Sequence, residues 1–291
     1  MKKIFLILLV LIGVSGCTQL DLNIPNSNAL ENDKDFVVNE NQVIAHYIDV
    51  GQGDASFIEL PNGEVMLIDA GIASSSEKII DYIKNLGYNR IDYVVATHPH
   101  ADHIGGMAEV IEAFDVGAIY MPKAVSTSKT YENLLETIKN KGLSVKTGKV
   151  GVSVLQEEDL TIEMLAPNQD KYSSLNNYSI VLKITYGNTS FLYTGDAEEL
   201  SEKEIMGNVE ADVLKVGHHV SDTSSSEEIL KRVNPKYAVI SVGEDNSYDH
   251  PASSTIKKLE KYTDHIYRTD LNGTVVVTSD GVNIAVKTER G

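Results

Sequence analysis

The stretch "ATHPHADHIGG", residues 96–106, places three histidines and an aspartate within six residues: His98, His100, Asp102 and His103. The chain has only eight histidines in 291 residues, so chance clustering in a solvated loop is improbable. Neutral imidazoles and carboxylates are usual ligands of zinc and related divalent ions, and a loop after a strand can direct several of them at one point. The stretch therefore predicts a metal site, with His98 and His100 on one face and Asp102 and His103 reaching a neighbouring ion.

The sequence on both sides alternates short β-rich runs with amphipathic helical runs. The first three strands follow one another closely, which favours antiparallel pairing. No tandem repeat or internal linker interrupts the pattern, so residues 43–291 are predicted to form one α/β domain, a four-layer αββα sandwich with sheets inside and helices outside. The predicted strands span residues 43–50, 55–60, 64–71, 91–97, 118–121, 151–156, 160–167, 178–186, 189–196, 211–217, 236–243, 273–279 and 282–288, and the predicted helices span 75–87, 105–114, 130–142, 198–206, 225–233 and 253–262.

The N-terminal residues, "MKKIFLILLVLIGVSG" (1–16), combine two lysines with an apolar run that is short for a membrane span. They predict an export signal, and "VSGC" resembles a bacterial lipobox, which implies cleavage before Cys17 and a lipid on that cysteine. An uncleaved N-terminal anchor is the alternative. Residues 17–42 are polar and without periodicity, which predicts a lipidated flexible tether. In both cases the domain would lie at the extracellular face of the cell membrane.

Cysteine content and charge limit the function further. Cys17 is the only cysteine, so no disulfide framework is possible and stability must come from packing and bound metal. The net charge is −17, and removal of residues 1–16 would take away two lysines. Such a chain repels polyanions at long range, which counts against tight non-specific binding of nucleic acid.

The motif H-x-H-x-D-H after a β-strand resembles the metallo-β-lactamase superfamily, whose members share the αββα sandwich. Further blocks, in order along the chain, resemble the extracellular hydrolase domain of the ComEC family of competence DNA-uptake proteins and its free-standing relatives. The resemblance covers about Val43 to Val286. Its blocks are "DVGQGDA" (49–55), "LIDAG" (67–71), "NNYSIVL" (176–182), "YTGD" (193–196), "LKVGHHVSDTSSS" (214–226) and "RTDLNGTV" (268–275).

The resemblance implies a centre with two divalent ions, Zn²⁺ or Mn²⁺. His98 and His100 would bind one ion, Asp102 and His103 the other, and Asp196 would bridge them. An aspartate at the end of the apolar strand "FLYTGD" can present two oxygens to two cations.

The pair His218 and His219 follows another apolar strand, and one of the two should complete the second ion's ligands. We favour His219, with His218 contacting the substrate or the other ion. Because strand alternation turns neighbours in opposite directions, one of the pair could instead be structural.

One departure concerns the first ion. Many superfamily enzymes use a further histidine before the bridging aspartate, yet no histidine occurs from Ile104 to Leu200. The ComEC-like branch carries an Asn and a Ser that match Asn177 and Ser179. The first ion should therefore be held more loosely, by a weak oxygen ligand or water, which favours manganese over zinc and argues against β-lactamase, lactonase and glyoxalase activities.

Four other residues have predicted supporting roles. Asp54 and Asp69 are expected to accept the distal N–H of ligand histidines, with turn formation beside glycine as the alternative. His46 and His265 lie in strand-like runs and are expected to be packing residues.

The mouth of the site should include hydroxyls that bind substrate phosphate or cap the following helix. Relatives usually have glycine where this chain has Val220 and Asp249, which adds bulk and charge there. The candidate substrate contacts are Ser221, Thr223, Ser224 and His250.

These residues predict an exported hydrolase of phosphate esters, with phosphodiesters favoured because in-line displacement suits two paired ions. Asp102 would orient the attacking water, and His218 or His250 would protonate the leaving oxygen. The substrate could be DNA or a cell-envelope polymer, since teichoic-acid phosphorylcholine esterases resemble the chain at the metal motifs. A basic patch of Lys215 and Arg268 in the cleft would favour DNA.

The alternative hypothesis is a surface binding protein that assists DNA uptake or envelope assembly. Its metal site would be structural or degenerate. The missing histidine, Val220 and Asp249 favour this alternative.

Overall fold

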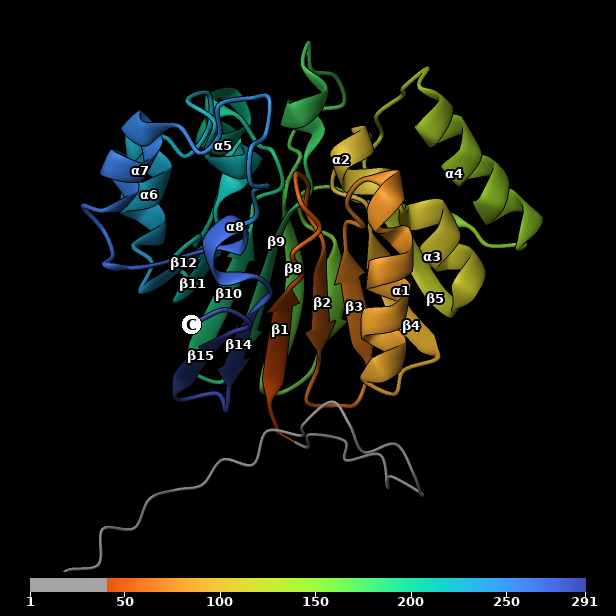
Figure 1. Ribbon diagram of the computed structural model, residues 1–291, viewed down its shortest axis with the longest axis horizontal. Coiled ribbons are helices and arrows are strands. Elements are labelled where there is room, and N and C mark those ends of the chain that lie inside the picture. The colour runs from red at the N-terminus through yellow and green to blue at the C-terminus, as the bar shows by residue number, and fades with distance from the viewer. Residues whose placement is uncertain (1–40) are drawn as a thin grey trace, which may run out of the picture. The chain divides into compact units, whose positions relative to one another are not determined.

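Two β-sheets face each other at the centre of the computed structural model, which describes residues 41–291 (Figure 1). The first sheet has the strand order β15-β14-β1-β2-β3-β4-β5-β6 and the second β13-β12-β11-β10-β9-β8-β7. The strands of the first are β1 (Val43–Tyr47), β2 (Ser56–Glu59), β3 (Val65–Ile68), β4 (Arg90–Val95), β5 (Asp115–Met121), β6 (Val145–Thr147), β14 (Val275–Ser279) and β15 (Ile284–Thr288). Those of the second are β7 (Ser153–Gln156), β8 (Leu160–Ala166), β9 (Val181–Tyr186), β10 (Thr189–Tyr193), β11 (Val213–Lys215), β12 (Tyr237–Ile240) and β13 (His265–Arg268).

Helices cover the outer faces of both sheets (Figure 1). On the first sheet these are α1 (Ser76–Asn85), α3 (Met107–Ala113) and α4 (Lys129–Asn140), and on the second α6 (Glu227–Val233) and α7 (Ser253–Leu259). The shorter elements are α2 (Ala101–Ile104), α5 (Glu199–Glu204), α8 (Thr269–Asn272) and the 3-10 turns η1 (Ala73–Ser75), η2 (Leu175–Tyr178) and η3 (Gly217–Val220). The predicted αββα sandwich is confirmed.

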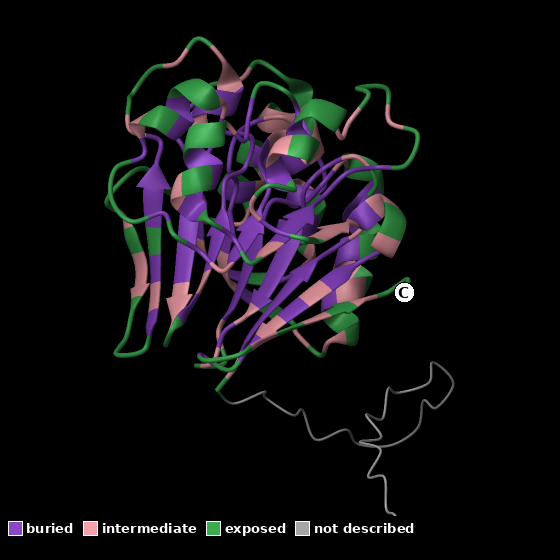
Figure 2. Cartoon of the chain, turned by 90° about the vertical axis from the view of Figure 1, so that its left-hand side faces the viewer, coloured by how far each residue is buried: buried purple, intermediate pink, exposed green. Residues whose placement is uncertain are grey.

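Three apolar clusters separate the four layers, because alternate residues of a strand point to opposite faces. In β2, Phe57 belongs to the cluster under α1, α3 and α4, while Ile58 belongs to the cluster between the sheets. In β10, Leu192 faces the cluster under α6 and α7, and Phe191 faces the first sheet. Both sheets are therefore buried on two faces, and Figure 2 shows the buried strands inside a partly exposed layer of helices.

The described residues all lie within one compact unit, and none of their helices is long and apolar enough to cross a membrane. The predicted signal (1–16), Cys17 and nearly all of the predicted tether (17–42) lie outside the described residues. Pairing of β1 with β2 and of β2 with β3 is antiparallel, as predicted, and β3 to β6 then run parallel.

Several details of the fold differ from prediction. The predicted helix 105–114 corresponds to α3 (Met107–Ala113), and the short helix α2 (Ala101–Ile104) before it was not predicted. Gly105 joins the two helices at a close approach, since a Cβ there would lie 2.3 Å from the Ala101 oxygen and 2.5 Å from Ala73 N. The predicted strand 178–186 begins only at Val181, because the turn η2 precedes it.

His46 and His265, both predicted to be packing residues in strands, differ in how far they are buried. His46 is buried, with Nε2 2.8 Å from Glu59 Oε1 and Nδ1 2.9 Å from the Tyr82 hydroxyl. The packing prediction for His265 is wrong: its side chain is exposed on the edge strand β13, where its ring lies against that of Tyr237.

Candidate metal centre

The clustered histidines lie where strands of both sheets end. β4 leads into His98, and α2 follows with Asp102 and His103. From the second sheet, β10 leads into Asp196 and β11 into the turn η3. The candidate site therefore takes side chains from both halves of the sandwich.

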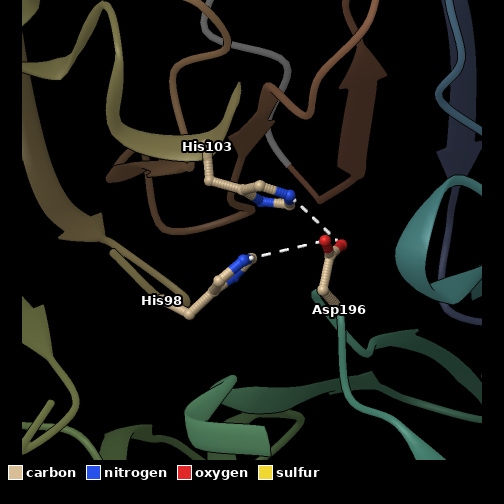
Figure 3. Close-up of side chains that lie close together, drawn as sticks. All are labelled: His98, His103 and Asp196. Carbon is tan, nitrogen blue, oxygen red and sulfur yellow. Dashed lines mark ion pairs between the residues drawn. The ribbon is translucent and has the colours of Figure 1, made fainter. Parts of the chain in front are cut away.

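The carboxylate of Asp196 points toward two of the histidines, His98 and His103 (Figure 3). His98 Nε2 is 3.7 Å from Asp196 Oδ2, and His103 Nε2 is 3.1 Å from Asp196 Oδ1. His100 adds its Nδ1 at 3.0 Å from His98 Nε2. All but His100 are almost completely buried. The two carboxylate oxygens of Asp196 thus face two different histidines, the arrangement expected of a bridging ligand.

A second group of ligand-type atoms lies beside the first. His219 Nε2 is 3.3 Å from Asp102 Oδ2 and 4.0 Å from Asp196 Oδ2. Asp102, His103 and His219 each offer one atom within 4.8 Å of the others, as do His98, His103 and Asp196. The structure therefore brings together all six predicted ligands, with His103 between the two groups.

The buried polar atoms of this centre fit divalent ions. His103 Nε2, Asp196 Oδ1 and His219 Nε2 are all inaccessible to solvent and make no hydrogen bond, and the first two face each other as an ion pair at 3.1 Å. Native proteins leave few buried polar atoms unpaired, because each unpaired atom is costly. Nitrogen and carboxylate donors that converge in this way match the ligand preferences of zinc and manganese.

Hydrogen bonds fix which nitrogen of each histidine faces the centre. Asp69 Oδ2 lies 2.7 Å from His103 Nδ1 and accepts its N–H, while Thr97 donates to the same carboxylate. His219 Nδ1 donates to the Ser241 carbonyl at 2.9 Å. Protonation of the distal nitrogen leaves Nε2 of both rings free to bind a cation. Asp69 therefore occupies the position expected of it.

The charges of the centre shift its pKa values in opposite directions. Burial disfavours the charged form of His103, but Asp196 and Asp69 outweigh burial and raise the His103 pKa. The pKa of His219 is also raised, since Asp196 and Asp54 outweigh its burial. The pKa of Asp196 is lowered despite burial, by His103 and His219. Without a metal ion, protons on these imidazoles balance the carboxylates, so binding of a divalent ion must release protons.

The paired histidines do not alternate as neighbours on a strand would. His218, His219 and Val220 all have left-handed backbone conformations, with φ of 50°, 49° and 66°. As a result both rings turn toward Asp196, and His218 Nε2 lies 3.8 Å from Asp196 Oδ2. The expectation that strand alternation would separate the two is wrong, because they lie in η3 and not in a strand.

Asp54 is held by a buried lysine rather than by a ligand histidine alone. Lys215 Nζ is 2.7 Å from Asp54 Oδ2, and Asp54 Oδ1 is 3.4 Å from His219 Nδ1. Lys215 is 2% exposed, and Arg268 is paired with Asp270. The basic patch that would favour DNA is therefore not formed by these two residues, because neither Lys215 nor Arg268 lines the pocket.

Comparison with known proteins agrees with this geometry: residues 48–244 match the family model described as "Metallo-beta-lactamase superfamily". The chain belongs to this superfamily of metal-dependent hydrolases. ComE operon protein 3 of Bacillus subtilis (strain 168) is 34% identical over 248 residues, which are 78% of this chain and 32% of that protein. Recombination protein 2 of Haemophilus influenzae is 30% identical over 238 residues, 79% of this chain and 28% of that protein.

The chain spans about a third of the length of these curated relatives. Among solved structures, CmlA, a diiron beta-hydroxylase from Streptomyces venezuelae, aligns with a TM-score of 0.51 at 16% identity, over 78% of this chain and 53% of that one. At this identity the likeness shows the fold alone. The sequence resemblance to the metallo-β-lactamase superfamily and its ComEC-like members is confirmed.

Asn177 and Ser179, which match the ComEC-like motif, make different contacts. Asn177 donates to Glu198 Oε2 at 2.6 Å and accepts from Ser201 N at 3.3 Å. Ser179 Oγ accepts from Asp196 N at 3.0 Å and lies 3.4 Å from His98 Nδ1. Ser179 therefore orients Asp196 and His98, whereas the side-chain hydrogen bonds of Asn177 go to Glu198 and Ser201.

The three hydroxyls predicted to bind substrate do not reach the pocket. Ser224 donates to the Gly217 carbonyl, and the Ser221 and Thr223 hydroxyls lie 3.2 Å apart. None caps α6, because Ser226 does so through Ile229 N. The substrate-contact prediction is therefore corrected: Thr223 instead holds His218 Nδ1, at 3.1 Å.

A pocket of about 430 Å³ opens above the centre. His250 reaches it as predicted, and four lining residues were not predicted: Gln52, Ile72, Ala101 and Tyr248. Gln52 lies in the motif "DVGQGDA" and Tyr248 in "SYDHP", which also contains His250. Their place in these motifs is the sequence feature that could have identified them as lining residues. The lining residues are Gln52, Ile72, His100, Ala101, Asp102, Asp196, His218, His219, Tyr248 and His250.

Proposed function

We propose that the chain is an exported, lipid-anchored phosphodiesterase that works with two divalent ions. The observation that carries this proposal is the convergence of buried nitrogen and carboxylate ligand atoms from both sheets at the floor of an open pocket. Two ions held there would supply an activated water and neutralise the charge of a phosphoryl group in displacement.

The chain's own residues would position the reactants. Asp102 is only partly buried and lines the pocket next to His219, so its carboxylate can orient an attacking water. The Thr223 hydroxyl holds His218 Nδ1, which leaves Nε2 on the side of Asp196. His218 is therefore placed to give a proton to a leaving oxygen. His250, whose ring centroid is 5.9 Å from that of His218, is the alternative donor.

The pocket's charge favours a phosphodiester over substrates with more anionic groups. Among the described residues, those lining the pocket include no lysine and no arginine, the side chains that recognise additional phosphates. A diester with one negative charge needs no cationic partner beyond the two ions.

Two kinds of phosphodiester remain candidates. The relatives include proteins named for competence and recombination, which supports DNA as substrate. The net charge of −17 counts against DNA, since an acidic protein repels long polyanions, and the resemblance to teichoic-acid phosphorylcholine esterases at the metal motifs supports a cell-envelope phosphodiester. The predicted export signal and the predicted lipid on Cys17 support a location at the extracellular face of the membrane, where both polymers occur.

An activity panel under Mn²⁺ and under Zn²⁺ tests the proposal. It compares DNA, bis(p-nitrophenyl) phosphate and phosphocholine esters, with metal content measured in parallel. We expect about two equivalents of metal per chain and turnover that Asp196→Asn abolishes. The matched control is Asp212→Asn, a carboxylate at the other end of β11 that pairs with Lys236 at 2.8 Å.

Turnover of one substrate class alone would identify the polymer. Tight binding of DNA or an envelope polymer without turnover would instead support the surface binding protein. Absence of both metal and turnover would refute the proposed function.

A further inference from the structure

The first ion lacks a full set of protein ligands in the site as described. His98, His100 and Asp196 supply three donors, and the histidine that many superfamily members place between residues 104 and 200 is missing. Tetrahedral sites usually take four ligands. A fourth donor must come from another side chain or from solvent.

Asn176, whose side chain lies next to His218, has an unused oxygen. The side chain is 7% exposed, and its Nδ2 donates to Glu198 Oε1 at 3.1 Å. Its Oδ1 is inaccessible to solvent and has no hydrogen-bond partner. A buried carbonyl oxygen in this state is unusual in a native protein and indicates a missing partner, such as a cation.

The contacts of the surrounding segment place Asn176 next to His218 and close to Asp196. Its Nδ2 lies 3.4 Å from His218 Nε2, which is 3.8 Å from Asp196 Oδ2. Three residues further on, Ser179 Oγ contacts both His98 Nδ1 and Asp196 N. The segment that begins with η2 therefore runs beside the two residues that define the first ion's position.

The neighbouring amide provides the contrast. Asn177 uses both ends of its side chain, since Nδ2 donates to Glu198 and Oδ1 accepts from Ser201 N. Glu198 thus anchors the two amide nitrogens, at 3.1 Å and 2.6 Å, while only Asn176 keeps a free oxygen.

We propose that Asn176 donates its carboxamide oxygen to the first ion, in the place of the missing histidine, with Glu198 as the residue that orients the amide. The inference concerns metal loading and goes beyond the proposed function, because it does not depend on which ester is cleaved. A carbonyl oxygen is a hard donor that suits Mn²⁺, whereas imidazole suits Zn²⁺. Asn176 would therefore bias the first position toward Mn²⁺.

The test is metal binding to the full chain, measured by calorimetric titration of Mn²⁺ and of Zn²⁺ and by metal content. Asn176→Ala is expected to weaken the first ion about 10- to 100-fold, the range typical for lost support of a metal site, and to leave close to one equivalent after dialysis. Asn176→His is expected to retain two ions and to raise the affinity for Zn²⁺ relative to Mn²⁺ about tenfold or more. Asn177→Ala is the matched control and should keep two ions.

Several results would overturn the inference. These are two ions bound by Asn176→Ala with wild-type affinity, an equal loss in Asn177→Ala, or loss of the first ion in His218→Ala but not in Asn176→Ala. If Asn176→Ala does not fold, the relative affinity of Asn176→His for Zn²⁺ and Mn²⁺ tests the inference. A preference between the two ions equal to that of the wild type would contradict Asn176 as a ligand. Two ions bound without any phosphodiesterase turnover would refute the proposed function and leave this inference standing.

Discussion

Substitution of Asp69 by Asn should weaken the second ion without removing any ligand. Asp69 is 1% exposed and accepts three hydrogen bonds, from Thr97 N at 2.8 Å, Thr97 Oγ1 at 2.6 Å and His103 Nδ1 at 2.7 Å. An amide retains one oxygen, which Thr97 can keep, but its NH₂ group would then face the N–H of His103. Two donors cannot share that contact, so the His103 proton is driven to Nε2, the atom that faces Asp196.

The expected loss follows from this change of tautomer. Substitution of residues that orient metal ligands typically costs 10- to 100-fold in affinity, or about 1.4–2.8 kcal/mol. Competition with a chromophoric chelator at neutral pH measures the affinity of each ion, and urea unfolding of the metal-free protein reports any general destabilisation. Asp212→Asn, which alters a carboxylate bonded to Ser190 N away from the centre, is the control. A folded Asp69→Asn protein with wild-type affinity for both ions would refute the reasoning.

Three further predictions concern pH, stability and turnover. The raised pKa values of His103 and His219 stabilise the metal-free fold below about pH 6.5, and this stabilisation is lost as pH rises through their folded pKa values. The Tm of the metal-free protein should therefore fall above that pH, and the increase in Tm on adding metal should grow. An increase in Tm that does not depend on pH would contradict this. Glu202→Ala removes a buried carboxylate that accepts hydrogen bonds from two backbone N–H groups at the start of α6. Urea unfolding should show a free energy of unfolding lower by about 2 kcal/mol, with metal content unchanged. An unchanged free energy of unfolding would argue against this role of Glu202. Thr223→Val removes the hydrogen bond to His218 Nδ1, so kcat should drop about tenfold while the number of bound ions stays constant. A kcat equal to that of the wild type would show that His218 does not carry out the proposed proton transfer.

Much of the fold could be predicted because its physical causes are local. Alternation such as Phe57 against Ile58 gives the two faces of a buried strand directly, and glycines such as Gly87 mark helix ends. The ligands of α2 could be predicted for the same reason, since all lie within one short stretch after β4. Asp69 could be predicted from its chemistry beside a histidine cluster.

The errors arose where backbone conformation or long-range contacts decide. The sequence does not show that His218, His219 and the β-branched Val220 all have left-handed backbone angles, and this run is what turns the two imidazoles the same way. The neighbouring amides Asn176 and Asn177 are equivalent in the sequence and differ only in which atoms Glu198 and Ser201 engage. The sequence does not show whether Lys215 lies in a cleft or in the interior. Its ion pair with Asp54 in the structure places it in the interior.

The left-handed run at residues 218–220 has a consequence for how tightly a cation is held. Glycine would reach these backbone angles freely, but it would also visit many others. Residues with a Cβ have few alternatives once neighbouring packing selects such angles, so the two imidazoles have little conformational freedom left to lose on ligation. The affinity of this preorganised turn is therefore set as much by the rigidity of its main chain as by the donor atoms it carries.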